Sequence, residues 1–285
     1  MKRIIIVSGL LFNLTFCFAQ IKGRCLDKEG RPIPYASVGL KNTELGTVSD
    51  KEGNFVIDSN LLSENNNVIV SCLGYETKSV LASSEENIDI FLKSITYELD
   101  EVKIEFAKQK FTKEKKIGSN SLNKHVAVSF SSRNLGAEIG KFFNVSKGRN
   151  YKVEKVRFNI SEMGYKKARF RINFYSATDA ENIDTEKTNL KDIIMEVSDS
   201  GDAEVDVSNE NLVFTNDFLV SIECLEYSIS NLQNDKSKKQ SIYFSSNVFC
   251  GPIYYRSSKI VKWIPNRGKY NVCLGMQLFT KTLRK

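Results

Sequence analysis

Histidine is almost absent from this chain of 285 residues, which carries it only at position 125. Zinc peptidases commonly use two or three histidine ligands, and hydrolase triads use a histidine as the general base. The scarcity therefore excludes most enzyme classes and leaves a hydrolase built on His125 as the least favoured function. With four prolines and sixteen glycines, the chain is also not collagen-like or proline-rich.

Long apolar runs are missing beyond the N-terminus. Two basic residues precede a mostly apolar stretch, residues 4–18, which is shorter than the roughly 20 residues that span a bilayer. Small residues follow, so we predict a secretory signal peptide over residues 1–19, cleaved after Ala19. The alternative is a lipoprotein signal with Cys17 as the lipidated residue, which bulky Phe16 disfavours.

The exported chain keeps five cysteines and a net charge of +5. An odd number of cysteines leaves at least one thiol unpaired. Their spacing fits neither a zinc site nor a dense disulfide framework, and the pairing stays open. Cys25 and Cys224 share a strand phase with apolar neighbours, so we expect both to be buried, and we expect no cofactor.

Short strand-like runs separated by turns fill residues 20–93. Roughly seven such runs predict a small antiparallel β-sandwich. The tetrapeptide Asp-Lys-Glu-Gly occurs at residues 27–30 and again at 50–53. Aspartate accepts backbone hydrogen bonds in a turn and glycine takes its positive-φ position. A calcium loop is the alternative, but two carboxylates per repeat are too few for that ion.

Three spaced segments of this region, residues 23–38, 46–55 and 71–76, resemble in order the motifs of the carboxypeptidase regulatory-like (transthyretin-like) domain. Residues 99–102 resemble the segment that follows this domain in many Bacteroidota envelope proteins. The resemblance covers residues 20–104 and implies a seven-stranded sandwich. The family's domain carries no catalytic residues, so the resemblance implies no carboxypeptidase activity.

Residues 94–117 interrupt the strand pattern and are rich in lysine, so we predict a linker, with a basic docking segment as the alternative. Apolar and polar residues alternate again over residues 118–285, which predicts a jelly-roll-like β-sandwich and an all-β chain. This half also resembles, more weakly, the β-rich region found after such domains in uncharacterised Bacteroidota proteins. The expected strands include residues 153–160, 168–175, 211–225, 241–250 and 270–279.

Charge is distributed unevenly in the second half. Residues 141–175 carry a net charge of +8, residues 176–210 carry −9, and residues 236–285 hold eleven basic residues and no acidic one. The favoured interpretation is that basic and acidic strands lie side by side and neutralise one another. The alternative is a basic face for an anionic partner such as lipopolysaccharide phosphate or an acidic glycan.

Aromatic residues and an arginine gather near the single tryptophan. Aromatic faces stack on sugar rings and arginine binds carboxylates or phosphates, although a lone tryptophan in a sandwich is also a common core anchor. The candidate ligand-binding residues are Trp263, Tyr254, Tyr255, Arg256 and Tyr270. Local acidity makes Asp199, Asp202 and Glu204 weak calcium candidates.

We therefore expect a non-catalytic, exported protein of the envelope or the medium that binds a glycan or a surface protein. The second hypothesis is a structural or assembly component of the cell envelope without a small ligand. The expected partners are a glycan, lipopolysaccharide or an envelope protein, with peripheral membrane association and no nucleic acid. The expected location is the periplasm, the outer-membrane surface or the extracellular space.

Overall fold

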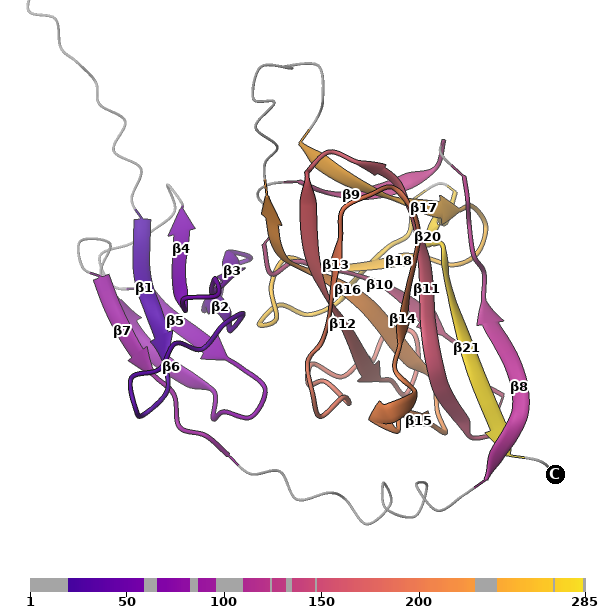
Figure 1. The fold of residues 1–285 in the computed structure, drawn as a ribbon, viewed down its shortest axis with the longest axis horizontal. Helices are drawn as coiled ribbons and strands as arrows, with labels where there is room; N and C mark the ends of the chain where they lie inside the picture. Colours follow the sequence, from indigo (N-terminus) through magenta and orange to yellow (C-terminus); the bar gives the residue numbers. More distant parts are fainter. Residues whose placement is uncertain are drawn as a thin grey trace, which may run out of the picture.

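The computed structural model describes residues 20–58, 66–82, 87–95, 110–123, 125–131, 135–146, 148–228, 240–268 and 270–283. The predicted signal peptide lies outside the described residues. The described chain is all-β, as predicted, and forms a small and a large body of strands side by side (Figure 1). One turn of 3-10 helix, η1 (Ser208–Glu210), interrupts the strands. No helix in the described ranges has the length and apolarity needed to cross a membrane.

The first sandwich has seven strands in two sheets, with the orders β4-β1-β7 and β3-β2-β5-β6. Strand β7 runs parallel to β1, so the prediction of a fully antiparallel sandwich is wrong at this pair. Between β1 and β7 the chain forms β4 in the same sheet and four strands of the other sheet. It then re-enters the first sheet as β7, in the same direction as β1. The strands are β1 (Gln20–Leu26), β2 (Ser37–Leu40), β3 (Gly46–Val48), β4 (Asn54–Asp58), β5 (Asn66–Ser71), β6 (Lys78–Ala82) and β7 (Asn87–Phe91).

Both Asp-Lys-Glu-Gly segments form turns, as predicted. Asp27 Oδ1 accepts the backbone N–H groups of residues 29 and 31, at 3.0 and 2.8 Å, and Gly30 has a φ of 80°. Asp50 Oδ1 likewise accepts the N–H groups of residues 52 and 54, and Gly53 has a φ of 79°. The carboxylates thus close turns, which supports the turn interpretation over a calcium loop.

The second sandwich packs a six-stranded sheet, β13-β12-β16-β10-β18-β19, on a sheet built along β20-β17-β11-β21-β8. Strands β14 and β15 pair with β11, and β9 pairs with β17. Much of the chain crosses from one sheet to the other between successive strands, which is a jelly-roll-like arrangement. The strands are β8 (Phe111–Gly118), β9 (Ala127–Ser131), β10 (Glu138–Phe143), β11 (Tyr151–Met163), β12 (Lys167–Ser176), β13 (Ile193–Val197), β14 (Gly201–Asp206), β15 (Val213–Phe214), β16 (Phe218–Ser228), β17 (Ser241–Asn247), β18 (Ile253–Arg256), β19 (Ile264–Asn266), β20 (Cys273–Leu274) and β21 (Met276–Leu283).

Alternation along β12 decides which side chains reach the core between the two sheets. The core-facing residues are Phe170, Ile172 and Phe174, all fully buried. The intervening residues project from the opposite, outer face of the sheet. These are Arg171, Asn173 and Tyr175, which are also buried. The outer face is therefore covered, and it carries polar groups.

Strand β8 replaces part of the predicted linker. Phe111–Gly118 pairs antiparallel with β21, so the prediction of a linker over residues 94–117 is wrong from Phe111 onward. Strand β8 lies at the edge of its sheet, and most of its lysine-rich side chains are exposed. Lysines on an edge strand oppose pairing with other chains. The same lysine-rich composition is typical of linkers, and for this reason the sequence predicted one here.

The cysteines of the described residues divide into one disulfide-bonded pair and three thiols. Cys250 and Cys273 form a disulfide, a pairing that the spacing had left open. Cys25 and Cys224 are buried free thiols, as predicted, and Cys72 is free and half-buried. Burial raises the pKa values of the Cys25 and Cys224 thiols to about 12, so both remain protonated and unreactive.

The two sandwiches meet around Tyr35, which precedes β2 and has a φ of 55°. Its hydroxyl donates to Glu226 at 2.9 Å and accepts a hydrogen bond from Arg169, both on the second sandwich. The backbone carbonyl of Tyr35 accepts a 2.7 Å bond from Arg171. Its ring shares a small buried apolar cluster with Val48 and Leu225. Hydrogen bonds and apolar contacts thus join the sandwiches.

Close packing at β3 predicts that Gly46→Val separates the sandwiches. A Cβ atom on Gly46 would lie 2.4 Å from Ser258 Cβ of the second sandwich, so a branched side chain cannot be accommodated there. Each sandwich keeps its own core, so we expect a larger radius of gyration in small-angle scattering and two calorimetric transitions. Gly268→Val, in an open loop, is the matched control. A single transition with an unchanged radius for Gly46→Val would contradict the expectation.

Candidate functional site

The outer face of the six-stranded sheet carries a buried polar network. Its members are Glu138, Arg171, Asn173, Ser221, Glu223 and Arg256, each at most 2% exposed. Asn173 donates to Glu223 at 2.8 Å, and the Arg171 guanidinium donates to the same carboxylate at 3.2 Å. Burial alone would raise the pKa of Glu223, but Arg171 and Lys187 outweigh it and lower that pKa. The carboxylate is therefore ionised inside the protein.

Three of the predicted ligand-binding residues belong to this covered face. Arg256 is fully buried and forms an ion pair with Glu138, and its guanidinium lies 4.4 Å from the ring centroid of Trp263. Trp263 is half-buried and also packs edge-on against Tyr175. Tyr254 is buried, and its hydroxyl donates to the carbonyl of Ala180 at 2.7 Å. These three residues lie together, and their contacts are with one another and with the rest of the protein.

The other two predicted residues lie elsewhere. Tyr255 follows Tyr254 on β18 and therefore faces the opposite way, where it packs against the core. Tyr270 lies in the loop before β20, where 53% of its surface is exposed. Side-chain alternation along a strand separates neighbours in sequence, so proximity in sequence did not place these residues together.

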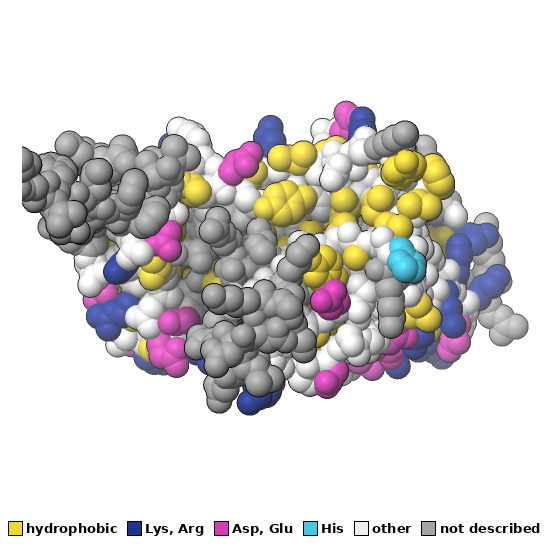
Figure 2. All heavy atoms as spheres, turned by 90° about the horizontal axis from the view of Figure 1, so that it is seen from above, with side chains coloured by type: hydrophobic (Ala, Val, Ile, Leu, Met, Phe, Trp, Pro, Cys, Tyr) yellow, Lys and Arg dark blue, Asp and Glu magenta, His cyan; other side chains and the backbone are white. Residues whose placement is uncertain are grey.

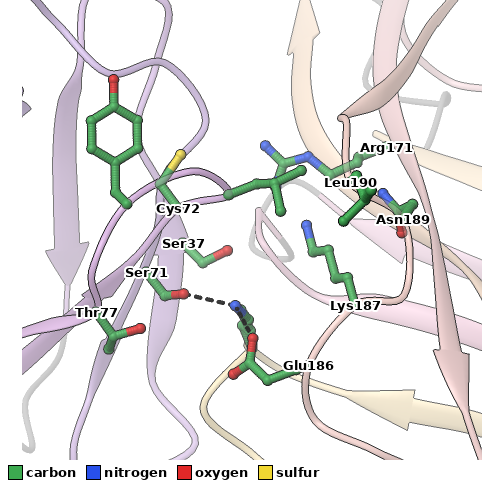
Figure 3. A pocket seen from close by; sticks show the side chains of 12 residues that line it. Ser37, Ser71, Cys72, Thr77, Arg171, Glu186, Lys187, Asn189 and Leu190 are labelled. Carbon is green, nitrogen blue, oxygen red and sulfur yellow. Dashed lines mark hydrogen bonds and ion pairs between the residues drawn. The ribbon is translucent and has the colours of Figure 1, made fainter. Parts of the chain in front are cut away.

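A polar pocket of about 280 Å³ opens where the two sandwiches meet; we call it the interdomain pocket. Figure 3 shows Arg171 and Lys187 extending from the second sandwich toward Ser37 and Cys72 of the first. Hydroxyl groups of Ser37, Ser71 and Thr77 line one side, and Arg171, Lys187 and Lys259 bring positive charge to the other. Leu73, Tyr75 and Leu190 provide the apolar wall.

Lys187 has the most unusual environment in the interdomain pocket. Its side chain is only 6% exposed, yet its ammonium lies 3.6 Å from Glu223 and 3.9 Å from Asp192, beyond hydrogen-bond distance. Among the described residues, these two ion pairs are not accompanied by a hydrogen bond of this ammonium. Burial lowers the pKa of Lys187, and Arg171 lowers it further, while the two carboxylates oppose the shift. A buried donor aimed into a cavity in this way is a feature of binding sites.

The loop that carries Lys187 is fastened to β12. The side-chain oxygen of Asn189 accepts the backbone N–H of Phe174 at 3.2 Å, and the N–H of Thr188 bonds to the carbonyl of the same phenylalanine at 2.8 Å. The two residues that follow Lys187 are thus fastened to β12. In sequence it is one of two lysines in the acidic stretch 176–210, a signal that could have singled it out.

Lys259 and Cys72 complete the polar lining. Lys259 bridges the two sandwiches, since its ammonium donates to Ser71 at 2.7 Å and pairs with Glu186 at 3.1 Å. Burial, with a contribution from Asp192, raises the pKa of the Cys72 thiol to about 11. That thiol is therefore protonated at neutral pH and is not an activated nucleophile.

Basic and acidic strands neutralise one another, as predicted. Strand β14 pairs with β11, and Glu204 forms ion pairs with Lys155 and Arg157 at 2.9 and 2.7 Å. On β13, Glu196 holds Lys167 and Arg169 in the same way. Strands β8 and β21 keep an excess of lysines along one side of the molecule, where Figure 2 shows basic side chains together.

The weak calcium candidates do not come together. Glu204 is engaged by two basic residues, Asp202 accepts a bond from Asn159 at 2.8 Å, and Asp199 accepts one from Ser198. Within the described ranges, no group of three or more histidine, cysteine, aspartate or glutamate residues is arranged to hold a metal ion. In the described structure these three weak candidates therefore form no shared set of ligands.

His125 is exposed just before β9 rather than set in a cleft. Its backbone N–H donates to Asn123 at 2.8 Å. Its imidazole forms no hydrogen bond or ion pair with the part of the chain that the structure describes. The hydrolase hypothesis needs a nucleophile and an acid within reach of this ring, and the geometry does not provide them.

These features define a class: an all-β protein of two joined sandwiches, with a polar pocket at their junction. More specifically, its first sandwich is a CarboxypepD_reg-like domain, since the family model of that description matches residues 21–104. The prediction from the three spaced motifs is confirmed. That family's domain is regulatory and non-catalytic, and no conclusion about the second sandwich follows from the match.

Two curated relatives match about a third of the chain. A segment of 112 residues is 33% identical to TonB-dependent receptor P39 of Formosa agariphila, covering 35% of this chain and 11% of the receptor. A segment of 102 residues is 30% identical to TonB-dependent receptor SusC of Bacteroides thetaiotaomicron, covering 35% and 10%. The chain thus spans about a tenth of the length of these relatives.

Similarity to solved structures is weak. The cysteine protease and lectin-like domains of Cwp84, a surface-layer-associated protein of Clostridium difficile, align over 93% of this chain and 58% of that one. The TM-score is 0.37 and the identity 10%. A score this low assigns no function to the second sandwich.

Proposed function

We propose that this protein is an exported, non-catalytic binding module of the cell envelope. It holds a carboxylate-bearing sugar of a glycan in the interdomain pocket. The observation that carries the proposal is the buried Lys187 ammonium, which is aimed into the pocket without a hydrogen-bond acceptor at normal distance. A ligand carboxylate would supply that acceptor in a site shielded from water, where such a bond is strong.

The rest of the lining suits an acidic sugar. Among the side chains that line the interdomain pocket, Arg171, Lys187 and Lys259 are basic and Glu186 is acidic, while Glu223 and Asp192 pair with the first two from behind the lining. Two hydroxyl-bearing side chains, Ser37 and Thr77, can exchange hydrogen bonds with sugar hydroxyls. The apolar wall offers a surface for the carbon face of a ring, and the volume accommodates one sugar rather than a chain.

Export and the absence of catalysis are supported by separate features. The N-terminal sequence has the pattern of a signal peptide, and the Cys250–Cys273 disulfide is typical of proteins outside the cytosol. The relatives that match about a third of the chain are named as TonB-dependent receptors. Cys72, the one thiol at the pocket, is protonated at neutral pH, and the only histidine lies elsewhere.

Replacing Lys187 by methionine is the direct test. Methionine keeps most of the length of the side chain and removes the ammonium, so the affinity for glucuronate or galacturonate should fall about 10- to 100-fold. Isothermal titration calorimetry of the full chain measures this loss, with glucose and galactose as uncharged probes expected to bind far more weakly. Lys191→Met is the matched control, because this exposed lysine lies in the same acidic stretch outside the pocket.

Two results would contradict the proposal. Equal losses in Lys187→Met and Lys191→Met would mean that overall charge, and not the pocket, attracts the ligand. No measurable binding of either uronate would favour the second hypothesis, a structural component of the envelope without a small ligand. Binding that survives 150 mM salt is part of the expected result, since buried pairs are screened less than exposed ones.

A further inference from the structure

A disulfide-bonded tip of the second sandwich exposes large apolar side chains to solvent. Phe249 is 78% exposed, Tyr270 53% and Val248 39%, and Leu122 on the adjoining segment is 67% exposed. We call these four residues the aromatic tip. Figure 2 shows hydrophobic side chains gathered beside the single histidine, which lies close in sequence to Leu122. Exposed apolar groups that cluster in this way mark interaction sites.

The aromatic tip is held rigidly. The Cys250–Cys273 disulfide joins the loop after β17 to the start of β20. The N–H of Phe249 bonds to the carbonyl of Tyr270 at 2.9 Å, and the N–H of Cys250 bonds to that of Asn271 at 3.3 Å. The two rings meet edge to face, with centroids 6.4 Å apart. A rigid aromatic pair loses little entropy when it binds a ligand.

Phe249 occupies its exposed position with a strained backbone. Its φ is 58°, a left-handed conformation that bulky residues rarely adopt. Glycine or asparagine would fit this position with less strain, and the exposed ring buries little surface in return. Strain of this kind at an exposed aromatic residue points to a function of the side chain.

The three segments that form the aromatic tip carry no charged residue themselves, while Lys124 and Lys269 adjoin them in sequence and the buried Lys141 contacts Ser119 and Cys273. Residues 119–123, 247–252 and 270–273 include no acidic or basic residue and four asparagines. Asn247 donates to Ser119 at 3.0 Å, which ties these segments together. The side-chain oxygen of the adjacent Asn120 is buried without a hydrogen-bond partner among the described residues. Amides beside an aromatic face are the chemistry that recognises neutral sugars, through hydroxyl hydrogen bonds and ring stacking.

We propose that the aromatic tip is a binding site for neutral sugar rings of a polysaccharide, separate from the interdomain pocket. A membrane surface is the other occupant to consider, but loops that insert into lipid usually carry basic residues around their apolar side chains. These three segments have none, and only two lysines, at positions 124 and 269, adjoin them in sequence. The proposal does not depend on the function proposed for the interdomain pocket, since it rests on other residues.

Phe249→Gly separates binding from stability. The substitution relieves the left-handed strain, so the melting temperature should rise or stay unchanged while polysaccharide binding falls about ten-fold or more. Affinity electrophoresis of the full chain in gels with β-1,4-glucan, α-1,4-glucan, xylan or mannan measures binding. Tyr270→Ala should show the same loss. Leu81→Ala, at an exposed leucine of the first sandwich, is the control and should bind like the parent.

Each other outcome counts against the proposal. Retardation by these polysaccharides that persists in Phe249→Gly would place the site elsewhere. No retardation by any of them would exclude neutral polysaccharide binding at the aromatic tip. Phe249-dependent sedimentation with phosphatidylcholine vesicles, without polysaccharide binding, would identify a membrane contact instead. Lys187→Met should leave polysaccharide retardation unchanged, so failure here and failure of the interdomain pocket are distinguishable.

Discussion

Arg256→Met is expected to destabilise the protein by about 3–5 kcal/mol, because it leaves a buried carboxylate without its cation. Arg256 is fully buried and Glu138 is 1% exposed. The guanidinium donates to Glu138 through Nε at 2.9 Å and through a second, shorter bond, and to the Tyr175 hydroxyl at 2.6 Å. Glu138 stays in the interior after the substitution and loses most of its compensation.

Denaturant unfolding measures this loss, and Trp263 reports it. The tryptophan is unique in the chain and packs on Arg256, so its fluorescence follows the region concerned. The double variant Arg256→Met with Glu138→Gln should recover a large part of the lost stability, since the uncompensated charge is gone. A single-variant loss below about 1 kcal/mol, the range of exposed ion pairs, would show that the pair is open to water.

Stability should rise with pH between neutrality and about pH 10.5 through one buried lysine. Lys141 lies on the core face of β10, is 6% exposed and donates to the carbonyl of Leu274 at 3.0 Å. Burial lowers its pKa from 10.5 to about 8. Between these values the unfolded chain binds more protons than the folded one, so the free energy of unfolding increases with pH.

The size of the effect follows from the shift of the pKa. Relative to Lys141→Met, the parent protein should gain about 3 kcal/mol of stability between pH 7 and pH 10.5. Urea unfolding at several pH values, with the disulfide intact, measures the difference between the two proteins. Other groups titrate in this window, and subtracting the variant removes their contribution. A difference that does not change with pH would mean that Lys141 keeps an ordinary pKa in the folded state.

Much of the fold could be predicted because strands and turns depend on local patterns. The alternating residues of β11 and β12 indicated strands, and the repeated turn tetrapeptide placed two of the reversals. Strand β8 was not predicted, because its lysines lie on an exposed edge, where few residues need to be apolar. The parallel pairing of β1 with β7 was not predicted either, since it depends on the edge at which the chain re-enters the first sheet after forming strands of the other sheet.

The candidate sites were only partly accessible to sequence reasoning. Tyr270 was selected for its aromatic ring, but its partner Phe249 was overlooked because its exposure results from a strained backbone. Arg256 was selected as a surface ligand and is instead fully buried. Lys187 was not selected, since nothing in its neighbours shows that a second domain covers it.

The amino-acid sequence by itself determined the all-β character, the family of the first sandwich and the neutralisation of charge between neighbouring strands. Each of these depends on residues close together in the chain or on motifs at set spacings. Only the tertiary structure decided which polar face is buried, because burial of Arg171 and Glu138 depends on segments far away in sequence. The interdomain pocket and the aromatic tip arise in the same way, from contacts between distant segments that no local pattern encodes.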